Sequence, residues 1–189
     1  MGVELDSSFR ATDTLNITFD AAYIDARFDR YPGAPCYGTT TVGVTPTPAP
    51  VGCFKNSAGQ FVQDNAGKTM PNAPKFKFTL SADQRIPLPG PFDLSVNGSY
   101  AYRTRAQMLP DNNPQAIQRA FGILNLGATL ATKDKTYSLS LFVNNVTDQH
   151  YVVDAEDFWN GPWAGHNTVI VQPARDSNRY FGARLSARF

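Results

Sequence analysis

The stretch LNLGATLATKDKTYSLSLFV, residues 124–143, carries the pattern that decides the fold. Apolar and polar side chains alternate on both sides of a short polar centre, Lys133-Asp134-Lys135. Successive side chains of a strand point to opposite faces, so this alternation predicts two strands whose two faces meet different surroundings. The charged centre predicts a tight turn between them.

The same two-residue period recurs along the chain. The predicted strands are 3–11, 15–28, 75–86, 92–103, 121–132, 137–147 and 178–189. A soluble β-sandwich also shows such alternation, so the period alone leaves that alternative open. Length separates the two folds, because a soluble strand has roughly five or six residues and a tilted membrane-crossing strand roughly 9 to 11. The predicted strands match the longer class.

The connections between these strands alternate between two kinds. The tight turns are 12–14, 87–91 and 133–135, and the long loops are 29–74, 104–120 and 148–177. Outer-membrane barrels have short periplasmic turns at one end and long outside loops at the other. The face opposite the apolar one carries Ser, Thr, Asn, Asp, Lys and Arg, which suits a hydrated lumen. The sequence therefore predicts an all-β fold, a portion of an antiparallel transmembrane β-barrel.

Composition excludes several other classes. Of the 189 residues 17% are charged and the net charge is +1, so the composition provides no strongly positive surface for binding nucleic acid. No stretch has the roughly 18 apolar residues of a membrane helix, and the N-terminus lacks the features of an export signal, which we expect to lie upstream.

Strand parity carries a further expectation. Single-chain bacterial barrels have an even number of strands, and a seven-stranded sheet would leave two unpaired edges in lipid. We therefore expect further strands before Val3 and interpret Met1 as a truncation or gene-call artefact. Assembly of several short copies into one barrel is the alternative.

Two segments resemble the end of TonB-dependent outer-membrane receptors. The L-x-V-x-N-L-x-D-x-x-Y signature of these receptors is similar to the segment Tyr137-Ser-Leu-Ser-Leu-Phe-Val-Asn-Asn-Val-Thr-Asp-Gln-His-Tyr151, which follows Asn125-Leu126-Gly127. Residues 179–189 resemble their last strand. The opening segments, 3–15 and 22–26, are similar to their paired strands. The resemblance implies a barrel of about 22 strands around an N-terminal plug, in the bacterial outer membrane.

The same resemblance implies function and partners. Such receptors import a scarce ligand, of the siderophore-iron, cobalamin or carbohydrate class, with energy from TonB. No plug or TonB box occurs in these residues, so TonB would act only through the missing N-terminal region. The resemblance also implies that Phe181 and the terminal Phe189 form a signal for the barrel-assembly machinery, in contact with outer-membrane lipid. Tyr151 fits an aromatic girdle, and Asn144, Asn145 and Asp148 fit the polar rim where the strand leaves the bilayer.

The only two cysteines, Cys36 and Cys53, both lie in the first long loop. In an oxidising exterior this pair predicts a disulfide that stabilises the loop by about 3 kcal/mol. Two free thiols are the alternative, and a zinc site is disfavoured because no Cys-x-x-Cys spacing occurs.

Candidate ligand-binding residues lie in the loops and near the strand ends. They are Arg103, Arg105, Asp157, Trp159, Trp163, His166 and Arg175. Arginines can attract an anionic chelate, and tryptophans and acids can stack on and hydrogen-bond a ligand. The alternatives are arginines that line a solvated mouth and aromatics that pack the loop or sit at the membrane interface.

Other functional classes were weighed against transport. The chain contains no nucleophile elbow, zinc-protease motif, phosphate-binding loop or dinucleotide fingerprint, so the sequence predicts no catalytic residue, no metal and no cofactor. A passive porin or structural barrel is the alternative function, and a barrel enzyme that uses the paired acids near Asp157 is a third.

Overall fold

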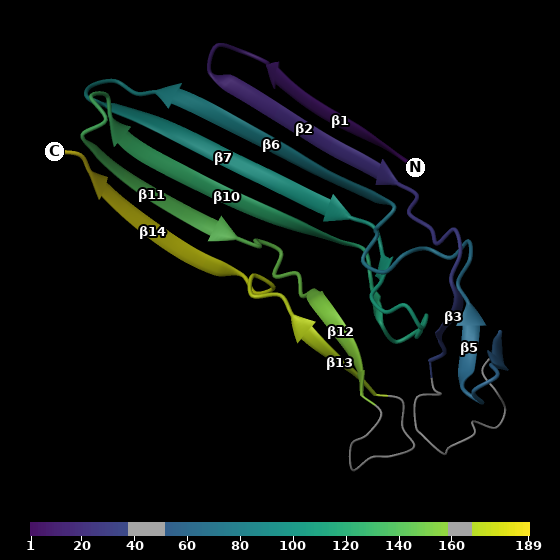
Figure 1. Ribbon diagram of the computed structural model, residues 1–189. Helices are drawn as coiled ribbons and strands as arrows, with labels where there is room; N and C mark the ends of the chain where they lie inside the picture. Colours follow the sequence, from purple (N-terminus) through teal and green to yellow (C-terminus); the bar gives the residue numbers. More distant parts are fainter. Residues whose placement is uncertain (38–51, 159–167) are drawn as a thin grey trace.

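The computed structural model describes residues 1–37, 52–158 and 168–189, and the described part is built from strands without helices (Figure 1). Among these residues no helix offers the length and apolar character that a membrane crossing requires.

One antiparallel sheet of seven strands forms the body of the molecule, in the order β1-β2-β6-β7-β10-β11-β14. Its strands are β1 (Gly2–Arg10), β2 (Leu15–Ile24), β6 (Phe76–Pro87), β7 (Phe92–Arg103), β10 (Phe121–Thr132), β11 (Tyr137–Asn144) and β14 (Tyr180–Ala187). Each strand pairs with the one before it in this order, so the sheet is a meander. This confirms the predicted all-β antiparallel fold.

Tight turns join the strands at one end of the sheet and long loops at the other (Figure 1). In the first turn the Thr12 hydroxyl accepts hydrogen bonds from the backbone N–H groups of Thr14 and Leu15 (3.2 and 3.0 Å). In the last turn Lys135 has a φ of 60°, and hydrogen bonds from Thr132 and Thr136 lower the pKa of Asp134. The N-terminus lies at the loop end and the C-terminus at the turn end (Figure 1).

The sheet has one polar and one apolar face because its register keeps like residues opposite one another. Lys77 pairs with Arg103, Ser81 with Ser99, and the hydroxyls of Thr129 and Ser140 share a hydrogen bond of 2.8 Å. The other face exposes large apolar side chains on all seven strands, for example Leu141 at 55% and Leu185 at 78%. An apolar surface of this extent indicates a lipid or protein neighbour.

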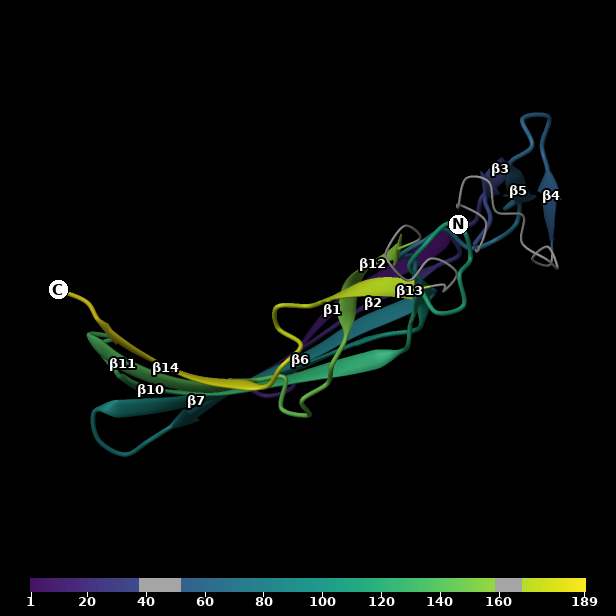
Figure 2. The ribbon, with the colours of Figure 1, turned by 90° about the horizontal axis from the view of Figure 1, so that it is seen from below.

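The sheet is curved but not closed (Figure 2). Among the described residues β1 and β14 each pair on one side only, through β2 and β11. The molecule is therefore a partial barrel with two open edges.

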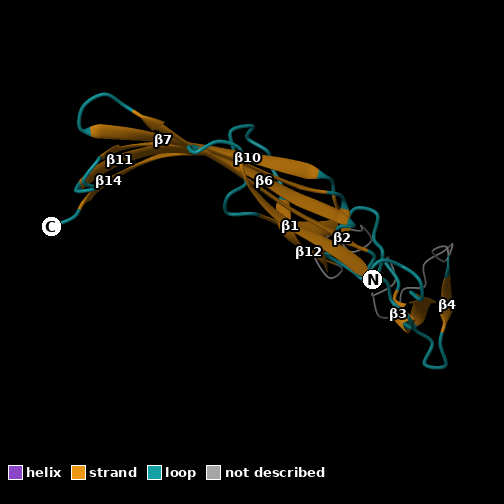
Figure 3. Ribbon diagram, turned by 90° about the horizontal axis from the view of Figure 1, so that it is seen from above, coloured by secondary structure: helices purple, strands orange, loops and turns teal. Residues whose placement is uncertain are grey.

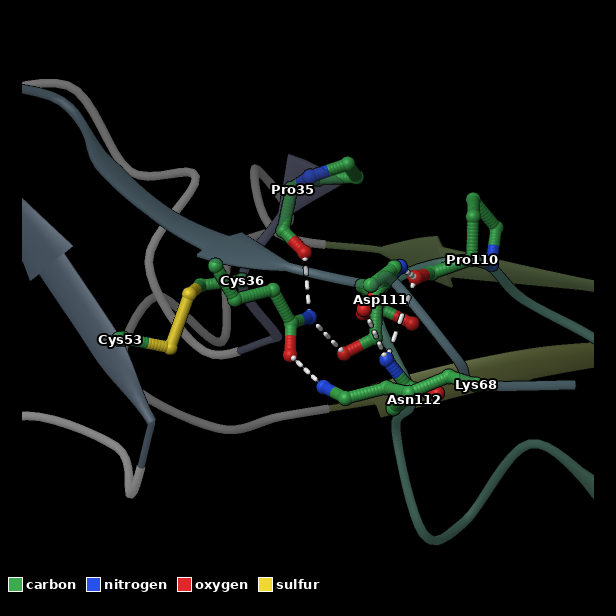
Figure 4. The surroundings of a disulfide bond; sticks show 9 residues. Pro35, Cys36, Cys53, Lys68, Pro110, Asp111 and Asn112 are labelled. Carbon is green, nitrogen blue, oxygen red and sulfur yellow. Dashed lines mark hydrogen bonds between the residues drawn. A yellow bond between two sulfur atoms is a disulfide. The ribbon is translucent and has the colours of Figure 1, made fainter. Parts of the chain in front are cut away.

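The long loops carry three small sheets at the loop end of the main sheet (Figure 1), and Figure 3 shows β3 and β4 beyond that end. The first loop (residues 25–75) contains β3 (Pro32–Pro35), β4 (Cys53–Lys55) and β5 (Phe61–Asp64). The second loop (104–120) contains β8 (Ala106–Gln107) and β9 (Ile117–Gln118). The third loop (145–179) contains β12 (Val152–Phe158) and β13 (Thr168–Pro173). Cys36 and Cys53 are joined by a disulfide with 6.2 Å between their Cα atoms (Figure 4).

Three strands are shorter than the sequence pattern predicts. β2 ends at Ile24 rather than at residue 28, because Ala26 and Phe28 form backbone hydrogen bonds with residues 67–70 of the first loop. β11 ends at Asn144 rather than at residue 147, because Asn145 adopts a left-handed φ of 51°. β14 covers Tyr180–Ala187 within the predicted 178–189.

Candidate functional site

A cavity of about 670 Å³ lies over the polar face at the loop end of the sheet. Its wall combines cationic, aromatic and amide side chains: Lys77, Arg103, Phe121, Asn125, Asn144 and Tyr151. Lys77, Arg103 and Phe121 are direct neighbours across β6, β7 and β10, so their side chains form one row across the sheet.

Arg103 is held against an aromatic stack. Its guanidinium carbon lies 4.8 Å from the centroid of the Phe121 ring, and Phe121 stacks on Tyr151 at 4.4 Å with 20° between the ring planes. The Arg103 Nε is buried without a hydrogen-bond partner, and Arg103 forms no ion pair with the described residues. A guanidinium that lines a cavity, lies on an aromatic face and has no ion-pair partner can bind an oxygen of an anion.

Asn145 brings Tyr151 to this stack. Its side chain accepts a hydrogen bond from Gln149 N (2.9 Å) and donates one to Gln149 O (3.1 Å), while its own N–H donates to Asn125 Oδ1 (2.9 Å). These bonds reverse the chain after β11, so that Tyr151 returns over the start of β10. Tyr151 thus faces the cavity on the polar side, which differs from the girdle position that the sequence suggested.

Acidic residues line the side of the cavity formed by β1 and β2. Asp6 and Asp20 are direct cross-strand partners, and Glu4 lies two residues before Asp6 in β1. Like charges directly opposite each other destabilise a sheet. Asp176, from the third loop, is a fourth carboxylate in the wall, which also contains the cations Lys77 and Arg103.

A second cavity, of about 690 Å³, lies where the first and second loops leave the sheet. Lys75, Arg105 and Arg119 contribute to its wall, and none of them forms an ion pair with a described residue. The positive charge near Arg103 thus extends outward into the loops.

The structure separates the other residues predicted to bind ligand. Arg105 lines the second cavity, Arg175 is exposed after β13, and Asp157 accepts a hydrogen bond from Asn113 Nδ2 (2.7 Å) in the packing between loops. Trp159, Trp163 and His166 lie outside the described residues. No group of three or more metal-ligating side chains occurs in the described part of the chain.

Sequence reasoning missed Phe121 as part of the site. Phe121 and Ile123 are apolar residues at the positions of β10 that alternate onto the polar face, out of phase with Leu124 and Leu126. This reversal of the pattern was a signal in the sequence. The contact of Tyr151 with Phe121 depends on the chain reversal at Asn145 and had no such signal.

Comparison with known proteins agrees with this architecture. Residues 1–146 match the family described as "TonB dependent receptor-like, beta-barrel". A search of curated proteins found no match.

Two solved structures share the fold. The ferric yersiniabactin uptake receptor FyuA from Yersinia pestis matches with a TM-score of 0.64 and 16% identity, over 96% of this chain and 22% of that one. The siderophore receptor PiuA from Acinetobacter baumannii matches with a TM-score of 0.64 and 21% identity, over 97% and 20%. The chain thus spans about a fifth of these receptors. With most of its residues matched by the family, the chain belongs to the TonB-dependent receptors and forms part of their β-barrel.

Proposed function

We propose that this chain is part of the wall of an outer-membrane receptor that binds a scarce ligand and imports it with energy from TonB. Family membership and the exposed apolar face support this proposal. TonB would act through a plug region elsewhere in the receptor.

We propose an anionic iron chelate as the ligand, in preference to cobalamin or a carbohydrate. The observation that carries this choice is Arg103, which lines the cavity, lies on the Phe121 ring and forms no ion pair with a described residue. The cations of the second cavity would raise the local concentration of an anion. One structural relative is named for the uptake of ferric yersiniabactin and the other as a siderophore receptor, which agrees with this choice.

The test substitutes Arg103 in the full-length receptor. Arg103→Gln is expected to weaken binding of ferric chelates by about tenfold or more, because a hydrogen bond to a charged group contributes about 1.5–3 kcal/mol. Arg184→Gln is the matched control, since Arg184 is on the same face of the sheet but pairs with Ser140 away from the cavity. Equal binding by both variants would contradict the proposed site. Uptake that persists without TonB would indicate a passive channel instead.

The assembly role of β14 stays a prediction. Phe181 is 76% exposed on the apolar face, and Phe189 lies beyond the end of β14. Deletion of Phe189 from the full-length receptor is expected to lower the yield of heat-modifiable barrel in the outer membrane. An unchanged yield would rule out recognition of this residue by the barrel-assembly machinery.

A further inference from the structure

Buried polar side chains and one small apolar cluster pack the three long loops into one unit. The cluster joins Met108 and Ala116 of the second loop to Ala155 of β12. From the first loop, Gln63 Nε2 donates to the carbonyl oxygens of Pro35 and Asp111 (2.7 Å each), and Asn65 Nδ2 donates to Pro110 O (2.6 Å) (Figure 4). From the third loop, Val152 N donates to Gln118 Oε1 (2.8 Å). The second loop therefore lies between the other two and is fastened to both.

The contact between the second and third loops contains two carboxyl groups. Asp111, only 7% exposed, and Asp157 of β12 are both hydrogen-bonded to one residue, Asn113. Asn113, fully buried, bridges them: its backbone N–H donates to Asp111 Oδ1 (3.1 Å) and its Nδ2 donates to Asp157 Oδ1 (2.7 Å). Two carboxyl groups held by one buried residue repel each other when both are ionised, so this arrangement is more stable when one of them carries a proton.

The surroundings favour that proton. Burial, the hydrogen bond with Asp157 and repulsion by its charge raise the pKa of Asp111 to about 7, against the opposing effect of the Asn113 N–H. Charged residues near the contact in sequence are Lys68 and Asp64 of the first loop and Asp154 and Glu156 of β12, while Arg105 and Arg119 of the second loop line the second cavity. Lys68 Nζ donates to Gln63 Oε1 (2.7 Å), and the three carboxylates are exposed.

We propose that Asp111 and Asp157 form a carboxyl clamp, which fastens the second loop to the third while the pair holds a proton and releases it when both groups are ionised. The clamp closes in acid. An open state leaves Asp111 in water with an ordinary pKa near 3.8, whereas the closed state keeps its proton up to about pH 7. The closed state therefore binds more protons between these two pH values, so it loses stability as the pH rises through this window.

The clamp would also control the candidate site, an extension that rests on the proposed function. Tyr151 immediately precedes β12, the strand that carries Asp157. Its ring supports Phe121 and, through it, Arg103. Release of β12 from the second loop would loosen this aromatic stack. The affinity for ligand would therefore be lower above about pH 7 than in acid.

The test measures the distance between the two loops in the full-length receptor. Spin labels at Gln115→Cys and Ile170→Cys, both exposed positions, report on the second and third loops. The ratio of open to closed populations is expected to rise at least about tenfold between about pH 4 and about pH 8, because one unit of pKa difference is tenfold in an equilibrium constant. Unmutated receptor treated with the same reagent serves as the control for labelling at native cysteines.

Amide variants separate the clamp from general effects of pH. Asp111→Asn keeps a neutral donor beside Asp157, so the ratio is expected to change by less than about twofold over the same range. Asp157→Asn removes the repelling charge and is expected to reduce the pH dependence similarly, which provides a second variant if the first misfolds. Asp154→Asn removes an exposed charge from the same strand and should behave like the wild type.

Two outcomes would overturn the proposal. One is a wild-type distance that does not change with pH, and the other is a pH dependence that both amide variants retain. Uptake of ferric chelate is measured separately on the same variants. A receptor that transports normally without pH-dependent loop distances refutes the clamp alone, and pH-dependent distances without any uptake refute the transport proposal alone.

Discussion

Phe142 is an aromatic residue on the polar face of the sheet, and its ring needs the space left by a glycine. Its cross-strand partner is Gly182, and a Cβ built on Gly182 would overlap the Phe142 ring. The ring also contacts Tyr180 edge-on, at 6.4 Å between centroids. The small residue Gly182 thus allows β11 and β14 to pair around the Phe142 ring.

We predict that Gly182→Ala destabilises the receptor by about 1–3 kcal/mol, as overpacking commonly does. Urea unfolding of the receptor in lipid vesicles measures this change. The loss of unfolding free energy caused by Gly182→Ala should be smaller in a Phe142→Ala background, because the overlapping ring is then absent. Gly98→Ala is the control, since its added Cβ would lie 3.1 Å from the flexible end of Leu126. Equal losses from both single variants would contradict this account.

Asn145 combines a left-handed backbone with a buried amide that is 1% exposed. Asn145→Ala is expected to lower the free energy of unfolding by about 1–3 kcal/mol, because the backbone groups of Gln149 lose their partners. Binding of ferric chelate should fall as well, since Tyr151 would no longer be held against Phe121. Asn145→Asp, which retains the accepting oxygen for Gln149 N, should lose less. Unchanged stability and binding in Asn145→Ala would show that the turn forms without this side chain.

At the scale of elements, the first loop is cross-linked where it packs against the second. The disulfide joins residues 17 apart in the sequence, and Pro35, next to Cys36, accepts a hydrogen bond from Gln63. A cross-link of this span stabilises by about 3 kcal/mol in the chain-entropy account.

We predict that Cys36→Ser/Cys53→Ser makes the first loop sensitive to protease while the barrel stays heat-modifiable. The reason is that the cross-link constrains the loop and not the main strands. Limited proteolysis of intact cells measures the effect, and thiol labelling with and without reductant shows whether the native pair is oxidised. Labelling of native receptor without reductant would favour the alternative of free thiols.

Sequence periodicity could predict the main strands but not the strands of the loops. Residues 124–143 alternate because the two faces of the sheet meet different surroundings, and this difference is visible in single residues. β3 contains two prolines and β8 only two residues, so neither can show a period. The pairing of β3 depends on contacts with a distant segment, such as Ala34 with Gln63 of β5. For the same reason the sequence suggested Arg103 but not the Phe121–Tyr151 stack beneath it.

At the scale of the whole molecule, the open edges decide whether the chain can function by itself. Unpaired backbone groups of β1 and β14 would each cost several kcal/mol in a hydrocarbon environment. We predict that the 189-residue chain alone, refolded into lipid vesicles, migrates identically in gels whether or not it is boiled. Full-length receptor under the same conditions should show a heat-dependent shift. A defined oligomer of this chain with such a shift would support assembly from several copies.

The direction of the two edge strands limits what can complete the barrel. β1 and β14 are the first and seventh strands of a meander, so they run the same way, from the loop end to the turn end. Copies joined head to tail would pair β14 with β1 in parallel, unlike the antiparallel barrels of outer membranes. Copies joined by like edges would be related by a twofold axis that turns one of them upside down in the bilayer. Antiparallel closure therefore requires an odd number of strands from another part of the receptor, the first and last of which run from the turn end to the loop end.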